Sequence, residues 1–327
     1  MNKIFIYSAV IGAMEDIMKK ILSLVLVAVM LCAALVSCGG ASYTLASGGT
    51  GGTYYAACVG LAGVYDTETS LKINVDSTGA SKANIQLVSN GQADFAIVQN
   101  DVMEYAYTGT DLFSDGEPIK NFRTVAAVYA EVCQIVASAE IESVADLKGK
   151  VVSIGAAGSG VEFNALQILE AYGLTRDDII PINADFNGSA TKFKDGEIDA
   201  FFVVAGAPTT AITDLSVNRE FKLLAIDDEH YDVLASKYGF YSKYPITAGT
   251  YTNTEDVQTV AVKATFICRE DIPEDVVYEF TKTLFEKKDA LTVAHNKFAN
   301  VDLSYAQDDI GSVPFHAGAL RYYNEVK

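Results

Sequence analysis

The sequence has no tryptophan, only three histidines, and few basic residues for its 327-residue length. Lys and Arg together number 24 against 42 Asp and Glu, which gives a net charge of −18. So acidic a chain is repelled by nucleic-acid phosphates, and nucleic acid is therefore excluded as a partner. The histidines lie in unrelated contexts, with no H-x-x-x-H pattern and no nearby cysteine, so no metal site is expected.

Cysteine is also scarce, with five in the chain and no C-x-x-C pair. Cys58, Cys133 and Cys268 are widely spaced, which fits neither a zinc knuckle nor a disulfide framework. Cys133 and Cys268 lie in two long apolar runs, and a disulfide between them requires that these runs pair side by side. Buried free thiols are the favoured interpretation, because a free cysteine behaves as a small hydrophobic residue.

One long apolar run is present, at 21–36, directly after Met18-Lys19-Lys20. A basic start, an apolar core and small residues are typical of a secretory signal, and the run is too short for a convincing membrane span. Leu35-Val36-Ser37-Cys38 resembles a bacterial lipobox, which implies cleavage before Cys38 and a lipid on its sulfur; ordinary signal cleavage nearby is the alternative. We expect a signal over 1–38 and, because 1–17 add acids upstream, translation from Met18.

The whole chain is 50% apolar and 20% charged, enough for a proper core and two domains. Short β-like runs alternate with amphipathic stretches, which predicts an α/β architecture with mostly parallel sheets. The helical patterns fall at 52–65, 80–89, 160–172, 188–195, 208–217, 228–238 and 273–290.

A faint internal duplication runs through these patterns. The glycine-rich turn at 47–53 has a partner at 155–160, and each follows a strand and opens a helix. "NGQADFAIV" at 90–98 likewise matches "DGEIDAFFV" at 195–203. The duplication predicts two similar α/β lobes, with chance similarity between small α/β units as the alternative.

Paired glycine turns indicate an anion site. Backbone N–H groups and helix N-termini can hold a carboxylate without a lysine-rich pocket. Helix capping and tight packing are the structural alternatives for the same residues, and Tyr251 is either a gate over the cleft or a packing residue. The candidate ligand-binding residues are Gly49, Thr50, Gly51, Gly52, Thr53, Tyr54, Ser77, Thr78, Gln99, Asn100, Ala157, Gly158, Ser159, Gly160, Ala205, Gly206 and Tyr251.

Several segments together carry a family resemblance: "GGTGGTYY", "STGASKANIQLVSNGQADFAIVQND", "VADLKGKVVSIGAAGSGVEFNALQILEAYGL", "KDGEIDAFFVVAGAPT", "TAGTYTNTEDVQTVAV" and "VPFHAGALRYYNE". In colinear order they resemble the TAXI family, the TRAP-associated extracytoplasmic immunogenic solute-binding proteins, over nearly all of 43–325. The resemblance implies a two-lobed periplasmic-binding-protein fold of type II with hinge-crossing strands. Lobe 1 would comprise 43–133 plus 263–327, and lobe 2 would comprise 134–262.

The resemblance also implies a function. The protein would capture a small carboxylate such as glutamate or 2-oxoglutarate and deliver it to TRAP membrane permease subunits, with no catalysis and no cofactor. It would be exported and either anchored by lipid at Cys38 to the outer face of the cytoplasmic membrane or periplasmic. The alternatives are a solute-sensing surface lipoprotein and, less favoured, an enzyme related to thiamine-precursor synthases, whose iron-binding cysteine cluster these scattered cysteines do not provide.

Overall fold

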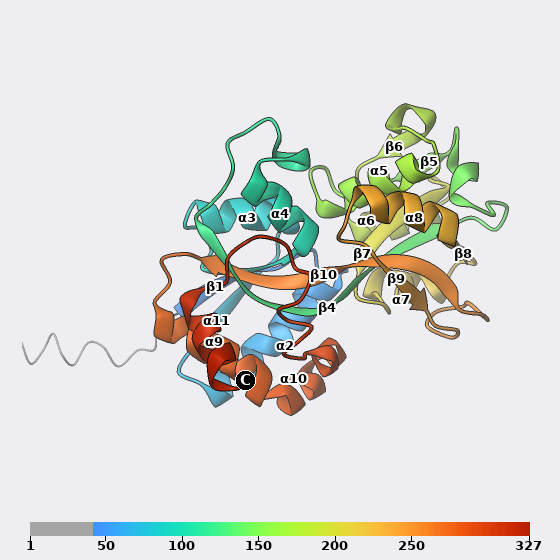
Figure 1. Cartoon of the computed structure of the whole chain (residues 1–327). Helices are drawn as coiled ribbons and strands as arrows, with labels where there is room; N and C mark the ends of the chain where they lie inside the picture. Colours follow the sequence, from blue (N-terminus) through green and yellow to red (C-terminus); the bar gives the residue numbers. More distant parts are fainter. Residues whose placement is uncertain (1–41) are drawn as a thin grey trace, which may run out of the picture. The chain divides into compact units, whose positions relative to one another are not determined.

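The computed structural model describes residues 42–327, which form one compact unit (Figure 1). The expected signal at 1–38, the start at Met18 and the lipidation site Cys38 lie outside the described residues. Within 42–327, no helix combines the length and the apolar character needed to cross a bilayer.

Ten strands form one sheet in the order β2-β1-β3-β10-β4-β7-β5-β6, with β8 paired to β4 and β9 paired to β10. The strands are β1 (Ser42–Ala46), β2 (Lys72–Asp76), β3 (Phe95–Gln99), β4 (Phe122–Ala137), β5 (Val151–Ser153), β6 (Ile180–Ile182), β7 (Ala200–Ala205), β8 (Lys222–Leu223), β9 (Ser242–Ile246) and β10 (Val257–Arg269).

Helices follow most of these strands, close to the expected positions. They are α2 (Thr53–Glu68), α3 (Ser81–Ser89), α4 (Asn100–Thr108), α5 (Gly160–Ala171), α6 (Phe186–Lys194), α7 (Thr210–Ser216), α8 (Asp228–Lys237), α9 (Glu274–Glu286), α10 (Lys288–Ala294) and α11 (Ala317–Glu325). The single helical pattern expected at 273–290 is divided between α9 and α10.

The duplication seen in the sequence corresponds to a repeated topology. β1 pairs in parallel with β2 and β3, and β5 pairs in parallel with β6 and β7. In each repeat the chain runs strand, helix, strand, helix, strand. β3 and β7 are buried along their whole length, as expected for strands covered on both faces.

The centre of the sheet departs from the expected parallel arrangement. β4 pairs antiparallel with β10 and β7, and β10 also pairs antiparallel with β3. The physical reason is that β4 carries the chain out of one lobe while β10 brings it back, as Figure 1 shows. The two strands that join the lobes therefore run in opposite directions.

β4 and β10 contribute to the hydrophobic cores of both lobes. Val125, Tyr129 and Phe266 pack in a core with α2, α9 and α11, whereas Cys133, Ile135 and Val260 pack in a core with α5 and α8. We call the part built around β1–β3, α2–α4 and α9–α11 lobe 1, and the part built around β5–β7 and α5–α8 lobe 2. The expected boundaries at 133/134 and 262/263 stay a prediction.

The three described cysteines are free and buried. Cys133 lies opposite Val204, whereas Cys268 lies opposite Arg123 near the other end of β4. The condition for a Cys133–Cys268 disulfide, that the two thiols meet side by side, is therefore not fulfilled, and the free-thiol interpretation holds.

Candidate functional site

A pocket of about 330 Å³ lies between the two lobes. We call it the outer pocket. Its walls are the turns after β1, β2 and β5 and the start of α6. The lining residues are Gly49, Thr50, Gly51, Gly52, Ser77, Thr78, Gly79, Ala80, Ala156, Ser159, Val161, Asp185, Phe186 and Asn187.

Four helices begin at the outer pocket. The residues that precede α2, α3, α5 and α6 are Gly52, Ala80, Ser159 and Asp185, and all four line it. Because a helix N-terminus carries unsatisfied N–H groups and partial positive charge, this convergence favours an anionic group. No Lys or Arg is among the lining residues, so among these residues the helix ends supply the positive potential.

The helix N-termini of the two lobes differ in side-chain capping. In lobe 2, Ser159 Oγ accepts a hydrogen bond from the Glu162 N–H at 3.3 Å, and Asp185 Oδ1 accepts one from the Gly188 N–H at 2.7 Å. In lobe 1, neither Gly52 nor Ala80 supplies a side-chain cap. The first-turn N–H groups of α2 therefore receive no side-chain acceptor from the residue that precedes the helix.

A buried amide holds the lobe 1 turns in place. Asn84 Nδ2 donates to the carbonyls of Ser47 at 2.6 Å and Ile97 at 2.8 Å, and Asn84 Oδ1 accepts from the Thr78 hydroxyl at 2.6 Å. Ala80, next to this turn, has φ 66° and ψ −151°, a strained conformation for a residue with a Cβ. Sequence reasoning missed Asn84, because an asparagine in a helix start has no distinctive pattern.

A second, smaller cavity of about 40 Å³ adjoins the outer pocket. We call it the inner pocket. It shares Gly49, Gly52, Ala80, Val161 and Phe186 with the outer pocket. The remaining lining residues are Gly48, Thr53, Tyr54, Gln99, Glu131, Val204 and Ala205.

Glu131 is the notable residue of the inner pocket, because its side chain is only 2% exposed. Burial raises the pKa of its carboxyl to about 8, while the nearby phenols of Tyr54 and Tyr129 and the Lys297 ammonium oppose the rise. Sequence reasoning missed Glu131, although the signal was available: it is the single acidic residue in the 16-residue run that forms β4. An acid in an otherwise apolar strand is a functional indicator.

The lobes touch along the cleft, so the structure is a closed arrangement. Thr53 Oγ1 donates to the Gly206 carbonyl at 2.9 Å, and the Ala211 N–H donates to the Gly51 carbonyl at 3.3 Å. The packing is tight at glycines: a Cβ on Gly160 would lie 1.8 Å from Gln99 Oε1.

A buried polar network also joins the lobes. Asn164 of α5 accepts from Gln99 Nε2 at 2.5 Å and donates to Asp101 Oδ2 at 2.8 Å and to the Tyr241 hydroxyl at 2.6 Å. Gln167, one turn further, donates to the Tyr105 hydroxyl at 3.1 Å. Burial raises the pKa of Asp101 to about 6, although the hydrogen bonds from Asn164 and the Val102 N–H oppose the rise.

Eleven of the seventeen candidate ligand residues line one of the two pockets. The outer pocket has Gly49, Thr50, Gly51, Gly52, Ser77, Thr78 and Ser159, and the inner pocket adds Thr53, Tyr54, Gln99 and Ala205. The other six, Asn100, Ala157, Gly158, Gly160, Gly206 and Tyr251, do not line either pocket.

Five of these six make contacts within the protein. Asn100 Oδ1 accepts from the Lys263 N–H at 2.8 Å, which ties α4 to β10. The Tyr251 hydroxyl accepts from the Thr209 N–H at 2.6 Å and donates to Gln134 Oε1, contacts that the packing alternative accounts for, and a gating role stays a prediction. Gly160 and Gly206 lie where the lobes meet, and the Gly158 N–H donates to Glu162 Oε2 at 2.6 Å.

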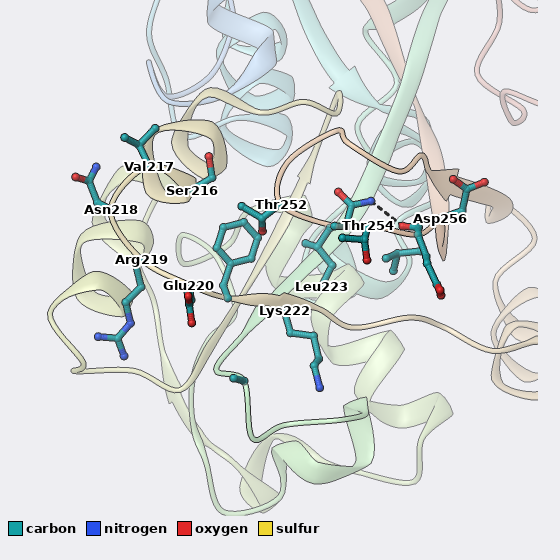
Figure 2. A pocket seen from close by; sticks show the side chains of 15 residues that line it. Ser216, Val217, Asn218, Arg219, Glu220, Lys222, Leu223, Thr252, Thr254 and Asp256 are labelled. Atoms are coloured by element: carbon teal, nitrogen blue, oxygen red, sulfur yellow. Dashed lines mark hydrogen bonds between the residues drawn. The ribbon is translucent and has the colours of Figure 1, made fainter.

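A hollow larger than the outer pocket lies elsewhere, on lobe 2, and measures about 810 Å³ (Figure 2). It is an open groove between the segment 216–223 and the loop 252–257. Val217 at its edge is 82% exposed. None of the candidate ligand residues lines this groove, so it is separate from the cleft.

Comparisons with known proteins agree with the fold. The model of a protein family described as the NMT1-like family matches residues 45–326. Among solved structures, a periplasmic transporter is 16% identical, with a TM-score of 0.51, covering 87% of this chain and 92% of its own. A protein from Bordetella bronchiseptica RB50 is 15% identical, with a TM-score of 0.51 and coverages of 87% and 82%. The alkanesulfonate-binding protein SsuA from Xanthomonas axonopodis pv. citri is 15% identical, with a TM-score of 0.49 and coverages of 89% and 92%.

These similarities are too distant to show more than the fold, and they confirm the two-lobed periplasmic-binding-protein architecture. The TAXI resemblance was wrong, because the family model that matches nearly the whole described chain is the NMT1-like family. The physical reason is that the motifs behind the resemblance are glycine turns that open helices and Gly-x-x-Asp turns before buried strands. Such turns serve the two-lobed fold itself and do not distinguish one family within it.

Proposed function

This chain belongs to the NMT1-like family, and on that premise we propose that it is an exported solute-binding protein without catalytic activity. It captures a small carboxylate between its lobes and passes the solute to a membrane permease. The predicted signal and lipidation site, which lie outside the described residues, would place it on the outer side of the cytoplasmic membrane.

The observation that carries the proposal is the convergence of four helix N-termini on one pocket between two lobes. Two of these ends, those of α2 and α3, have no side-chain cap. A carboxylate has the acceptors that such N–H groups need, and its charge is favoured by the helix ends. An outer pocket of about 330 Å³ is within the size range of small-molecule sites.

Closure of the lobes would let a membrane permease distinguish the solute-loaded protein from the empty one. The lobes meet through Thr53 and Gly206 and through Gln99 and Asn164. A solute that contacts both lobes binds the closed form better than the open form and therefore shifts the protein toward closure. A permease that recognises only the closed form would then receive loaded protein.

The test is a direct titration of residues 39–327, which leaves out Cys38, since residues 42–327 are compact by themselves. After unfolding and refolding to remove co-purified solute, glutamate, glutamine and 2-oxoglutarate are titrated by calorimetry. We expect one-site binding with a Kd of about 1 μM or tighter, equivalent to roughly 8 kcal/mol. Failure of all three solutes to bind a folded protein would count against carboxylate capture.

Two glycine variants make the titration specific for the cleft. A Cβ on Gly49 meets nothing within 4 Å, so Gly49→Trp should fold and fill the outer pocket. Gly239 of lobe 2 has the same open surroundings, and Gly239→Trp is the matched control. We expect Gly49→Trp to abolish binding and Gly239→Trp to leave it unchanged; equal binding by both would place the solute outside the cleft.

A further inference from the structure

Three buried polar atoms next to the inner pocket have no hydrogen-bond partner among residues 42–327. They are the hydroxyls of Tyr54 and Tyr129 and Oε1 of Glu131. Tyr129 and Glu131 are two residues apart on β4, so their side chains leave the same face of the sheet, while Tyr54 is in the first turn of α2. Buried polar groups are nearly always paired, so three unpaired atoms at one place point to a missing partner.

Among residues 42–327, the Glu131 carboxyl forms no ion pair within 4 Å. Lys297 acts on Glu131 through its charge and lowers the pKa of the carboxyl. Its ammonium, however, donates to the Ala207 carbonyl of lobe 2, and Glu131 Oε1 stays without a partner within the described chain. A buried, uncompensated carboxyl is costly for the fold unless a bound cation or a proton compensates it.

We propose that Glu131, Tyr54 and Tyr129 form a subsite that binds a primary ammonium group of the captured solute. This inference rests on the proposed function, because it names the chemistry of one end of that solute. The match is in number and size: an ammonium has three donors, and the subsite offers three unpaired oxygens. An inner pocket of about 40 Å³ holds one group of the size of a water or an ammonium.

The charges around the two pockets give the solute its orientation. Glu131 lines the inner pocket alone, whereas Gly52 and Ala80, which precede α2 and α3, line both pockets. The ammonium therefore lies inward against Glu131, and the carboxylate extends past Gly52 and Ala80 into the outer pocket. The reverse orientation would bring the carboxylate against the buried Glu131, whereas Asp185, the acidic residue of the outer pocket, caps α6.

Binding is then coupled to a proton. Without solute, burial raises the pKa of Glu131 to about 8, so its carboxyl is mostly protonated near neutral pH. A bound ammonium favours the ionised form, and the carboxyl releases up to about one proton on binding near pH 7. The titratable groups that act on Glu131 from the surrounding elements are Tyr54, Tyr129, Asp101, Lys297 and Tyr305.

The test uses pairs of solutes that differ in the amine alone. Glutamate is compared with 2-oxoglutarate, and taurine is compared with isethionate, by calorimetry on the wild type and on Glu131→Gln. We expect the wild type to prefer the amine by about 100-fold or more, since a site built for a donor rejects an analogue without it. In Glu131→Gln the preference should fall below about tenfold, because the amide keeps the shape of the carboxyl but not its charge.

The control variant is Glu104→Gln, which changes a carboxylate that binds Ser312 and lines neither pocket. It should keep the full preference for the amine. A second readout is the buffer dependence of the binding heat near pH 7. Wild type and Glu104→Gln should release close to one proton with an amine solute, and Glu131→Gln should release none.

The outcomes separate the subsite from carboxylate capture. If 2-oxoglutarate binds as tightly as glutamate, or if Glu131→Gln keeps the preference, the ammonium subsite is overturned while capture stands. If no solute of the panel binds, methylammonium chloride is compared with sodium chloride as a stabiliser in thermal unfolding. A higher Tm with methylammonium in the wild type but not in Glu131→Gln supports the subsite without capture, and equal Tm values overturn both.

Discussion

Lobe 1 and lobe 2 have the same core topology but present different chemistry to the cleft. The strand orders β2-β1-β3 and β6-β5-β7 are equivalent, and each lobe directs two helix N-termini at the outer pocket. In lobe 2 these helix ends are capped by Ser159 and Asp185, whereas in lobe 1 the equivalent positions are Gly52 and Ala80, which provide no cap. The repeat thus fixes where the helices begin, and the cap residue decides whether their N–H groups are free.

The unpaired polar atoms show the same asymmetry. Tyr54 belongs to lobe 1, and Tyr129 and Glu131 lie on β4 where it leaves lobe 1. Lobe 2 contributes Phe186, Val161 and Val204, which are apolar walls of the inner pocket. We expect a solute to bind lobe 1 first, through its free donors and acceptors, and lobe 2 to close over it.

The largest effect is expected from Gly160→Ala, which breaks the contact between the lobes. The new Cβ would lie 1.8 Å from Gln99 Oε1 and 2.9 Å from Val102 Cγ2 in the closed form. The lobes would have to stay apart, and we expect solute affinity to fall by about 100-fold or more, which is roughly 3 kcal/mol. Calorimetry measures the loss, and solution scattering should show a larger radius of gyration with saturating solute than in the wild type.

Gly63→Ala is the control for this variant. Gly63 lies in α2, and a Cβ there meets nothing within 4 Å. We expect unchanged affinity and a gain of about 0.5 to 1 kcal/mol in stability, since alanine favours a helix more than glycine. Unchanged affinity in Gly160→Ala as well would mean that the solute does not require closure.

A smaller effect is expected from Asp101, which lobe 1 presents to Asn164 of lobe 2. Burial raises its pKa to about 6, above the value near 4 in an unfolded chain. The native state therefore binds more protons between about pH 4 and pH 6, and stability decreases as pH rises through this window. In Asp101→Asn this group no longer titrates, so the variant does not lose this stability. The free energy of unfolding of the variant minus that of the wild type should therefore increase by on the order of 2 kcal/mol from pH 4 to pH 7.

Urea unfolding of both proteins at the two pH values measures this difference. The charge of Asp101 also raises the pKa of Glu131, so a part of the difference comes from this coupling. A difference that does not change with pH would show that Asp101 is ionised at little cost in the native protein, and its buried contact with Asn164 would then not penalise its charge.

Changes at the helix caps are expected to alter the free energy of unfolding by about 1 kcal/mol. Removing a cap in lobe 2 should lower it, and adding a cap in lobe 1 should raise it. Asp185→Ala removes the cap of α6 and should lower the free energy of unfolding by about 1 kcal/mol without weakening solute binding. Gly52→Ser adds a cap to α2 at φ −107° and ψ 165°, a conformation suitable for a capping serine. It should raise stability and weaken binding, because the serine oxygen takes an N–H group that the solute needs.

Unfolding in urea and calorimetric titration of both variants check the two signs. A Cβ at position 52 would lie 3.2 Å from the Phe186 ring, so Gly52→Ser and Gly52→Ala both crowd this ring. Gly52→Ala adds the Cβ without a capping oxygen and is therefore the control for crowding. If Gly52→Ser and Gly52→Ala weaken binding equally, crowding and not capping is the cause, and the two lobes would not differ in the way we infer.

The repeated part of the fold was predicted because the duplication consists of short local patterns, the glycine turns and the Gly-x-x-Asp segments. Gly91 and Gly196, which lie in the duplicated segments, have φ values of 71° and 75°, a conformation that favours glycine. The antiparallel centre of the sheet was not predicted, because the direction of β4 relative to β10 depends on contacts between residues far apart in the chain. An apolar run such as that of β4 looks the same in either direction.

The cleft was predicted at its turns and at two strand ends, Gln99 of β3 and Ala205 of β7. The glycine turn at 47–53 and the turn at Ser77 and Thr78 line the pocket as expected, because a helix start fixes where its N–H groups point. Glu131 and Tyr129 were missed, since strand residues reach the pocket through the pleat of β4 and the closure of the lobes. Tyr251 was a candidate from its polar loop, but its hydroxyl is bound within lobe 2.

The smallest effects are expected from removing a single tyrosine hydroxyl, either that of Tyr129 next to the inner pocket or that of Tyr323 in the core of lobe 1. The hydroxyl of Tyr129 has no hydrogen-bond partner among the described residues, whereas the Tyr323 hydroxyl donates to the Val125 carbonyl at 2.7 Å. Both rings are buried in the same hydrophobic core. Tyr323→Phe should therefore lose about 1 kcal/mol of stability, and Tyr129→Phe should lose nothing or gain a few tenths of a kcal/mol.

Solute binding should show the opposite ranking, with weaker binding of an amine solute in Tyr129→Phe and unchanged binding in Tyr323→Phe. Thermal unfolding and calorimetry on the two variants measure both rankings. A loss of stability in Tyr129→Phe equal to that in Tyr323→Phe would mean that the Tyr129 hydroxyl is already satisfied without solute. In that case an ordered water holds the subsite, and the asymmetry between the lobes would be limited to the helix caps.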